Sequence, residues 1–222
     1  MCGIVGYIGD DKATPILLNG LEKLEYRGYD SAGVAVYQNH SVEVVKSKGR
    51  LKNLCDILNS DNHMTGTLGI GHTRWATHGE PSDINSHPHC SENGSFAVVH
   101  NGIIENYLYL RDYLMNKGKR FASETDTEVV AQLLEYYYNG NILDTIIKVL
   151  SKIEGAYALG IICKDDPDTL YAARKDSPLI IGLGKGENFI ASDIPAIIDK
   201  TRDIYRLNDN EIAVIKRDNV TV

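Results

Sequence analysis

A chain of 222 residues, 43% of them hydrophobic and 24% charged, is long enough to bury a large core in one compact domain. Its formal net charge of −7 argues against a basic surface for nucleic acid or an anionic membrane. The sequence contains no apolar run of about 18 residues, no secretory signal and no transit peptide, and its four cysteines lack paired spacing. We therefore expect free thiols in a reducing, cytoplasmic compartment.

Apolar spacing predicts short strands and amphipathic helices in a mixed order. In chain order we expect a strand at 4–8, a helix from 14 to about 26, strands at 34–37 and 42–46, a helix at 51–58, a strand at 68–72, helices at 104–115, 129–134 and 142–153, strands at 157–163, 170–174, 179–182 and 189–191, a short helix at 195–199 and a strand at 211–216. The order lacks the regular alternation that a parallel sheet needs. It predicts a four-layer α/β/β/α sandwich of two mostly antiparallel sheets.

The chain start, Met1-Cys2-Gly3, places a small residue directly behind the initiator methionine. An aminopeptidase is expected to remove Met1, which would leave a free α-amine and a thiol on the same residue. The amine, with a pKa near ~7.7–8.0, could take the thiol proton, so Cys2 would supply both nucleophile and base. A cysteine near an N-terminus is more often inert and buried, and Cys2 alone does not decide between these interpretations.

Local signals predict three further details. Thr14 fits the N-cap of the first helix, and Thr125 with Glu128 fits a capping box at the start of a later one. Arg27 and Asp30 could form an ion pair that holds the turn between them, or a solvated pair of little consequence.

The most polar segment, residues 72–82, follows the strand at 68–72 and ends in turn residues, which is typical of a functional loop on a rigid element. Arg74 is the candidate ligand residue, because a planar guanidinium clamps a carboxylate through two hydrogen bonds; an ordinary surface arginine is the alternative. Several histidines nearby suggest zinc. Cys-x-x-Cys and His-Glu-x-x-His spacings are missing, however, and Pro88 restricts a shared geometry, so we expect no metal.

Asn101-Gly102 follows an apolar run and by propensity predicts a type I′ hairpin. Because a helix is expected directly afterwards, a strand-to-helix turn that faces a pocket is the favoured interpretation. The Asn101 amide and the Gly102 N–H could then form an oxyanion hole. Asp126 is left over as a carboxylate that could bind a ligand ammonium.

Six segments in order resemble the glutaminase domain of the glucosamine-6-phosphate synthases (glutamine–fructose-6-phosphate aminotransferases, isomerising), which belong to the class II, N-terminal-nucleophile glutamine amidotransferases. The resemblance covers essentially the whole chain. The segments are Cys2-Gly3-Ile4-Val5-Gly6, Tyr26-Arg27-Gly28-Tyr29-Asp30-Ser31-Ala32-Gly33, His72-Thr73-Arg74-Trp75-Ala76-Thr77-His78-Gly79, His87-Pro88-His89, His100-Asn101-Gly102-Ile103-Ile104-Glu105-Asn106 and Ser123-Glu124-Thr125-Asp126-Thr127-Glu128.

This resemblance implies a role for each matching residue. Cys2 would attack the side-chain amide of glutamine, and Asn101 and Gly102 would stabilise the oxyanion. Arg74 would bind the α-carboxylate of glutamine and Asp126 its α-ammonium. The remaining substrate-binding positions would be Trp75, which also gates an ammonia channel in the family, and Thr77, His78 and His87. It implies no cofactor and no metal.

The family enzyme is longer, and the full-length protein is a homo-oligomer. It carries a C-terminal isomerase half that binds sugar phosphate. We therefore expect residues 1–222 to form the glutaminase domain, which would hydrolyse glutamine without making glucosamine 6-phosphate unaided. Two other classes remain open. A glutamine sensor without turnover would not need the Cys2 amine, and another N-terminal-nucleophile hydrolase, such as an acylase, would have little use for Arg74 and Asp126.

Overall fold

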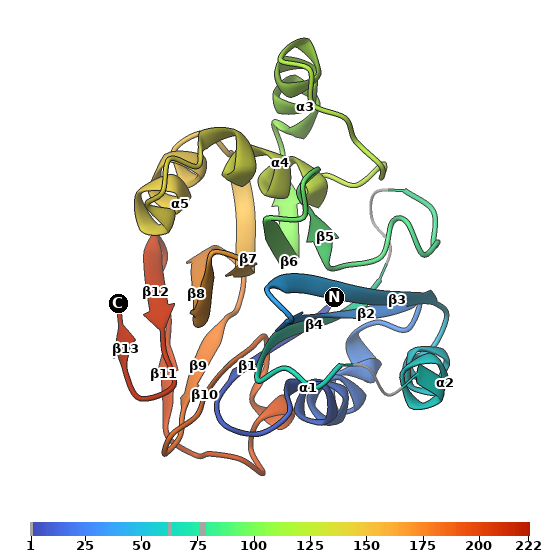
Figure 1. Cartoon of the computed structure of the whole chain (residues 1–222), viewed down its shortest axis with the longest axis vertical. Coiled ribbons are helices and arrows are strands. Elements are labelled where there is room, and N and C mark those ends of the chain that lie inside the picture. The colour runs from blue at the N-terminus through green and yellow to red at the C-terminus, as the bar shows by residue number, and fades with distance from the viewer. Residues whose placement is uncertain (1, 62–63, 76–78) are drawn as a thin grey trace.

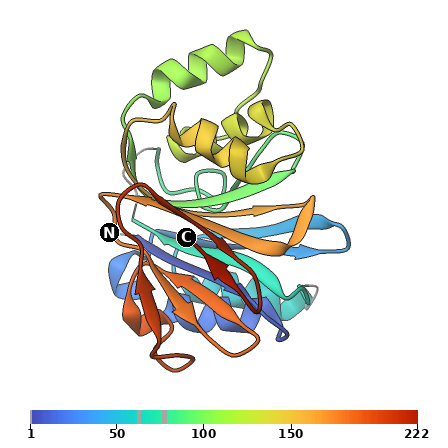
Figure 2. The ribbon, with the colours of Figure 1, turned by 90° about the vertical axis from the view of Figure 1, so that its left-hand side faces the viewer.

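Two antiparallel sheets stack face to face, with helices covering both outer sides (Figure 1, Figure 2). The structure, a computed structural model, describes residues 2–61, 64–75 and 79–222. Its elements, in which η marks a 3₁₀ helix, are β1 (Gly3–Ile8), α1 (Ala13–Glu22), η1 (Glu25–Arg27), β2 (Ser31–Gln38), β3 (Ser41–Lys48), α2 (Leu51–Asp61), β4 (Leu68–Arg74), β5 (His89–Cys90), β6 (Phe96–Ile104), α3 (Tyr107–Asn116), α4 (Thr127–Tyr137), α5 (Ile142–Leu150), β7 (Gly155–Cys163), β8 (Asp166–Lys175), β9 (Ile180–Leu183), β10 (Asn188–Ala191), η2 (Ile194–Ala196), β11 (Ile204–Arg206), β12 (Glu211–Ile215) and β13 (Val220–Thr221). The expected four-layer sandwich is confirmed.

The chain start lies in the middle of the first sheet. This sheet has seven strands in the order β11-β9-β10-β1-β4-β2-β3, and the second has six in the order β13-β12-β8-β7-β6-β5. Antiparallel partners flank β1 on both sides: Gly3 pairs with Thr73 of β4, and Val5 pairs with Ala191 of β10. A terminal strand that is paired on both edges does not fray.

Three apolar clusters hold the four layers together. Between the sheets, Ile4 and Ile70 pack with Val99 and other aliphatic residues from the second sheet. A second cluster joins the first sheet to α1 and α2, and a third joins the other sheet to α3, α4 and α5. Alternate residues of the central strands β1, β6 and β7 therefore enter different clusters, as expected for strands buried on both faces.

The Asn101-Gly102 pair forms neither the hairpin nor the strand-to-helix turn that its sequence favoured. β6 continues straight through it, with Gly102 paired to Tyr157 of β7, and α3 begins only at Tyr107. Gly102 has a φ of 131°, and a Cβ built there would lie 2.0 Å from the carbonyl oxygen of Ala156. The glycine therefore allows two neighbouring strands to approach closely, and does not create a turn.

Both predicted helix caps are wrong. Lys12 occupies the N-cap of α1, and Thr14 instead donates to the carbonyl of Met64 at 3.2 Å. Asp126 occupies the N-cap of α4 without a side-chain cap bond. Glu128, the expected capping-box partner, accepts hydrogen bonds from a loop before the helix, namely from the backbone N–H of Ala122 and Ser123 and from the Ser123 hydroxyl.

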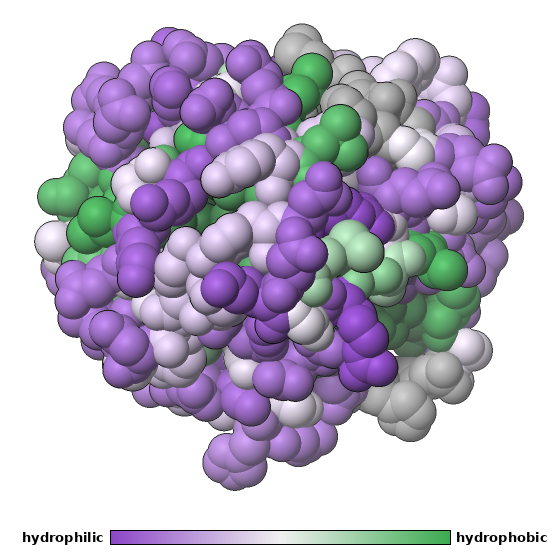
Figure 3. Space-filling view, turned by 90° about the horizontal axis from the view of Figure 1, so that it is seen from above, coloured by the Kyte–Doolittle hydropathy of each residue, from purple (hydrophilic) through white to green (hydrophobic). Residues whose placement is uncertain are grey.

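The outer face formed by α3, α4 and α5 is mostly hydrophilic, with apolar residues in separate patches (Figure 3). The exposed apolar residues Leu108, Tyr109 and Met115 lie on α3. Within the described ranges, no helix is both long and apolar enough to cross a membrane.

Candidate active site

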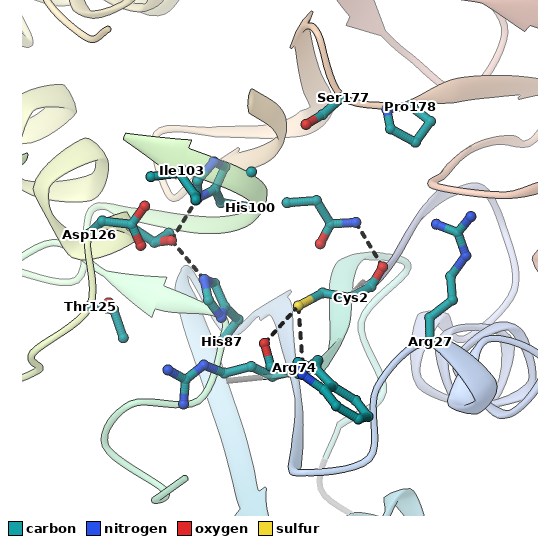
Figure 4. Close-up of a pocket in the computed structure, with 14 residues that line it drawn as sticks. Cys2, Arg27, Arg74, His87, His100, Ile103, Thr125, Asp126, Ser177 and Pro178 are labelled. Carbon is teal, nitrogen blue, oxygen red and sulfur yellow. Dashed lines mark hydrogen bonds between the residues drawn. The ribbon is translucent and has the colours of Figure 1, made fainter. Parts of the chain in front are cut away.

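A cavity of about 220 Å³ brings together residues from both sheets and from the start of α4. Seven of the nine residues predicted to act in the site line it, and their roles stay predictions: Cys2, Arg74, Trp75, His87, Asn101, Gly102 and Asp126. The other two, Thr77 and His78, lie outside the described residues. Figure 4 shows Cys2 in the middle of this group, with Arg74, His87 and Asp126 toward one side and Arg27 toward the other.

Cys2 is half-buried and contacts the residue that follows β4. Its Sγ accepts a hydrogen bond from the backbone N–H of Trp75 at 3.2 Å and lies 3.5 Å from the Trp75 carbonyl oxygen. Burial raises the pKa of the Cys2 thiol, and the hydrogen bond from Trp75 partly offsets this rise. The thiol is therefore protonated at neutral pH and needs a base before it can act as a nucleophile.

Asn101 lines the same cavity and contacts the main chain of this cysteine. Its side-chain Nδ2 donates a hydrogen bond to the Cys2 carbonyl oxygen at 3.0 Å. Because Asn101 sits near the end of a nine-residue strand that is paired along its length with β7, its position is fixed by the sheet and not by a loop.

Arg74 and Asp126 provide opposite charges on the cavity wall, and both are almost fully buried. Arg74 ends β4 and donates through Nη2 to the carbonyl of Gly79 at 3.0 Å. Burial lowers the pKa of Arg74, and the charges of Cys2, Asp30 and Asp126, in that order, oppose the change. The Oδ2 of Asp126 accepts a hydrogen bond from the N–H of Ile104 at 2.8 Å. A ligand with one carboxylate and one ammonium would match this pair.

Four buried histidines, His72, His87, His89 and His100, form a layer at the cavity, and His87 and His100 line it. The rings of His72 and His87 stack with centroids 4.2 Å apart, and His89 lies edge-on to His87 at 4.7 Å. The Thr127 hydroxyl lies 2.8 Å from both His87 Nε2 and His100 Nδ1. Burial lowers the pKa of His72 to about 3 and those of His87 and His89 well below their usual value, so these rings are neutral at pH 7.

Histidines close together in the sequence suggest zinc, whereas their spacing argues against it. In the part of the chain that the structure describes, no group of three or more histidine, cysteine or acidic side chains is arranged to hold a metal ion. Hydroxyl groups are the partners of these rings instead: Thr127 contacts His87 and His100, and Thr125 contacts His89 at 2.9 Å.

The segment before β2 supports the chain that carries Arg74 and Trp75. A Cβ built at Gly28 would lie 2.7 Å from the Arg74 carbonyl carbon, so this glycine permits direct backbone packing. The N–H of Asp30 donates to the Arg74 carbonyl at 3.0 Å. Trp75 is 46% exposed, and its ring lies edge-on to Tyr29 with centroids 5.4 Å apart.

Sequence reasoning missed several residues that line the cavity. Arg27 is one of them, and its ion pair is formed with Asp193, 3.0 Å away, near η2. Ser177 and Pro178 lie in the connection between β8 and β9 and also line the cavity (Figure 4). No local signal in the sequence links these residues or Asp193 to Cys2. Only the tertiary fold brings these segments together.

Two stacked antiparallel sheets, with a cysteine at the chain start bonded through its carbonyl to an asparagine amide, define an N-terminal-nucleophile amidotransferase fold. The chain belongs to the glutamine amidotransferase domain family, whose sequence profile matches residues 72–199.

Individual relatives agree with this assignment. The chain is 66% identical over 220 residues to the glutamine–fructose-6-phosphate aminotransferase (isomerizing) of Caldanaerobacter subterraneus subsp. tengcongensis and 59% identical to that of Clostridium tetani. Each match covers 99% of this chain but only 36% of the relative. The solved glutamine phosphoribosylpyrophosphate amidotransferase of B. subtilis, in complex with ADP and GMP, is 27% identical with a TM-score of 0.86, covering 99% of this chain and 48% of that one.

The low pKa of His72 predicts how stability depends on pH. The unfolded chain binds a proton at this ring below a pH of about 6.5, whereas the folded chain binds it only near pH 3. This contribution to stability is therefore complete above pH ~6.5 and is lost as the pH falls. Relative to a His72→Phe variant, the wild-type free energy of unfolding should fall by about 1.4 kcal/mol per pH unit between pH ~6 and ~4, measured by urea denaturation.

An Ile70→Val variant on the same strand is the control, because it removes buried volume but no titrating group. Its stability should run parallel to that of the wild type over this pH range. A His72→Phe curve that is also parallel would show that the ring is not buried in its neutral form.

Proposed function

We propose that this chain hydrolyses the side-chain amide of glutamine to glutamate and ammonia through a γ-glutamyl thioester on Cys2. The observation that carries the proposal is the contact of one asparagine amide with Cys2, in a cavity whose wall also holds one buried cation and one buried anion. Membership of the glutamine amidotransferase domain family supports the same substrate.

The reaction begins once Met1 has been removed. The α-amine of Cys2 takes the thiol proton, because burial keeps the thiol protonated in the resting site. The thiolate attacks the amide carbon of glutamine, and Asn101 and Gly102 donate hydrogen bonds to the resulting oxyanion; one such donor is worth about 10²–10³-fold in rate. The protonated amine then gives its proton to the leaving nitrogen, and ammonia departs.

The thioester is hydrolysed in a second addition and collapse. A water molecule loses its proton to the α-amine and attacks the thioester carbon, and the same donors hold the second oxyanion. Collapse breaks the carbon–sulfur bond, returns the proton to the thiolate and releases glutamate.

In this proposal Arg74 binds the α-carboxylate of glutamine and Asp126 binds its α-ammonium. Both side chains are buried on the cavity wall, so a ligand without the matching charge would lose a charge-assisted hydrogen bond to one of them. Trp75 and His87 line the same cavity, and Thr77 and His78 are proposed as further substrate contacts in the loop between them.

The ammonia has a proposed use in a longer protein. The relatives are named for glutamine and fructose 6-phosphate, and this chain spans 36% of their length. We therefore infer that residues 1–222 act as the glutaminase domain that supplies ammonia to C-terminal isomerase domains, for the conversion of fructose 6-phosphate to glucosamine 6-phosphate in a homo-oligomeric enzyme. Four free cysteines support a cytoplasmic setting.

When this chain is supplied with glutamine and fructose 6-phosphate, we expect glutamate and ammonia in equal amounts and no amino sugar, as measured by NMR of the products. The control is the same mixture without fructose 6-phosphate, which should release ammonia at the same rate. Glucosamine 6-phosphate made by this chain alone would contradict the proposal that the sugar reaction takes place in C-terminal domains.

Replacement of the nucleophile tests the covalent step. Cys2→Ala should lower glutamine hydrolysis by at least about 10³-fold, and it should abolish the mass adduct formed with an electrophilic glutamine analogue. The matched control is Cys55→Ala, a half-buried thiol on α2, which should keep both activities.

The α-amine has its own test, because a glutamine sensor would not need it. A variant with a bulky residue inserted between Met1 and Cys2 should retain Met1. It should lose turnover although its thiol is intact. Glutamine binding with no turnover by the correctly processed wild-type chain would favour the sensor.

Asp126→Asn tests recognition of the ammonium. The amide oxygen can still accept the bond from Ile104, so only the charge is lost. We expect kcat/KM for glutamine to fall by about 10- to 100-fold, while kcat/KM for glutaramate, which is glutamine without its α-amine, does not fall. Asp112→Asn, on the exposed side of α3, is the control and should change neither value. A wild-type chain that hydrolyses glutaramate as well as glutamine would favour an acylase.

A further inference from the structure

His72 makes a contact that the proposed chemistry has not used. This histidine lies on β4, is fully buried, and faces the end of β6. Its Nε2 lies 3.0 Å from the carbonyl oxygen of His100 and 3.0 Å from Oδ1 of Asn101. A backbone carbonyl can only accept a hydrogen bond, so Nε2 must carry the hydrogen.

The orientation of the Asn101 amide follows from two contacts that agree. On one side Nδ2 faces the Cys2 carbonyl, which only accepts; on the other Oδ1 faces the Nε2–H of His72. A flipped amide would place two acceptors together at Cys2 and two donors together at His72. Both contacts therefore select the same orientation.

The alternative tautomer of His72 is disfavoured by its surroundings. With the hydrogen on Nδ1, the lone pair of Nε2 would face two acceptors. Nδ1 itself is buried and has no hydrogen-bond partner among the residues that the structure describes. Burial also keeps the ring neutral, and the positive charge of Arg74 and the neighbouring His100 act in the same direction. The Nε2–H is thus a permanent donor at neutral pH.

We infer that His72 is a positioning residue that holds the Asn101 amide with its nitrogen toward the reaction centre. Nδ2 carries two hydrogens, of which one goes to the Cys2 carbonyl, and the second can serve the oxyanion. Without the bond at Oδ1, only the contact with the Cys2 carbonyl opposes a half-turn of the amide. The turned amide would present its oxygen, which would repel the oxyanion. The inference rests on the proposed function, because it takes Asn101 as the oxyanion donor.

A double-mutant cycle tests whether His72 acts through Asn101. The kinetics of glutamine hydrolysis would be measured for the wild type, His72→Phe, Asn101→Ala and the double variant, each with removal of Met1 verified by mass. We expect His72→Phe to lower kcat by about 10- to 100-fold with little change in KM, and to change kcat by less than about 3-fold in the Asn101→Ala background. An equal loss in both backgrounds, or a loss confined to KM, would overturn the inference.

Two further variants separate positioning from simple damage to the core. His72→Gln keeps an N–H donor on a shorter polar side chain and should recover part of the lost kcat. His89→Phe is the matched control: it is another buried histidine of the same layer, and its recorded bond is to Thr125. Whatever the size of its effect on kcat, the factor should be the same in both Asn101 backgrounds, because the hydrogen bond of His89 goes to Thr125 and not to that amide.

A measurement on the unmodified chain is independent of activity and of variants that fail to fold. Nitrogen NMR of the ring should show His72 with the hydrogen on Nε2 and a bare Nδ1 from pH 5 to 8. The opposite tautomer, or a ring that titrates in this range, would overturn the inference. If the tautomer is as expected while the wild type releases no ammonia, the proposed hydrolysis fails and the assignment of the Asn101 orientation stands.

Discussion

The pairing of β1 on both edges is the constraint on which this site depends. Chain ends usually fray, yet here β4 and β10 hold the first strand, and the N–H of Ile4 also donates to the Ser192 hydroxyl at 3.0 Å. Cys2 therefore has a defined place although it lies at the end of the chain. Arg74 and Asn101 come from the strand beside it and from the facing sheet, so their positions relative to the thiol are set by sheet pairing and sheet stacking.

The buried histidines let the site be polar without adding charge. A protonated ring in this layer would face the Arg74 guanidinium at close range and would carry the full cost of desolvation. Neutral rings instead provide directed donors and acceptors to Thr127, Thr125 and the Asn101 amide. The almost fully buried charges of the cavity wall are then Arg74 and Asp126, whereas Arg27 is paired with Asp193, and this balance suits a zwitterionic ligand.

Much of the fold could be predicted from the sequence, because strands and helices with strong apolar periodicity keep it in the structure. The errors lie where a local signal competes with a distant partner. The Asn101-Gly102 pair favours a turn, but it forms part of a strand because it pairs with β7. Glu128 resembles a cap residue, but its carboxylate accepts hydrogen bonds from the loop before the helix. His72 could not be assigned a role from sequence, since its partners are defined only by the stacking of β4 on β6.

The central place of β1 also affects the order in which the molecule is made. During synthesis β10 leaves the ribosome about 185 residues after β1, which corresponds to about 10–40 s of translation. Throughout that interval the first strand lacks one of its two neighbours, and the first sheet stays incomplete. Until β10 has paired with β1, the strand next to Cys2 is held on one side only, so the cavity that Cys2 lines can take its final shape only late in synthesis.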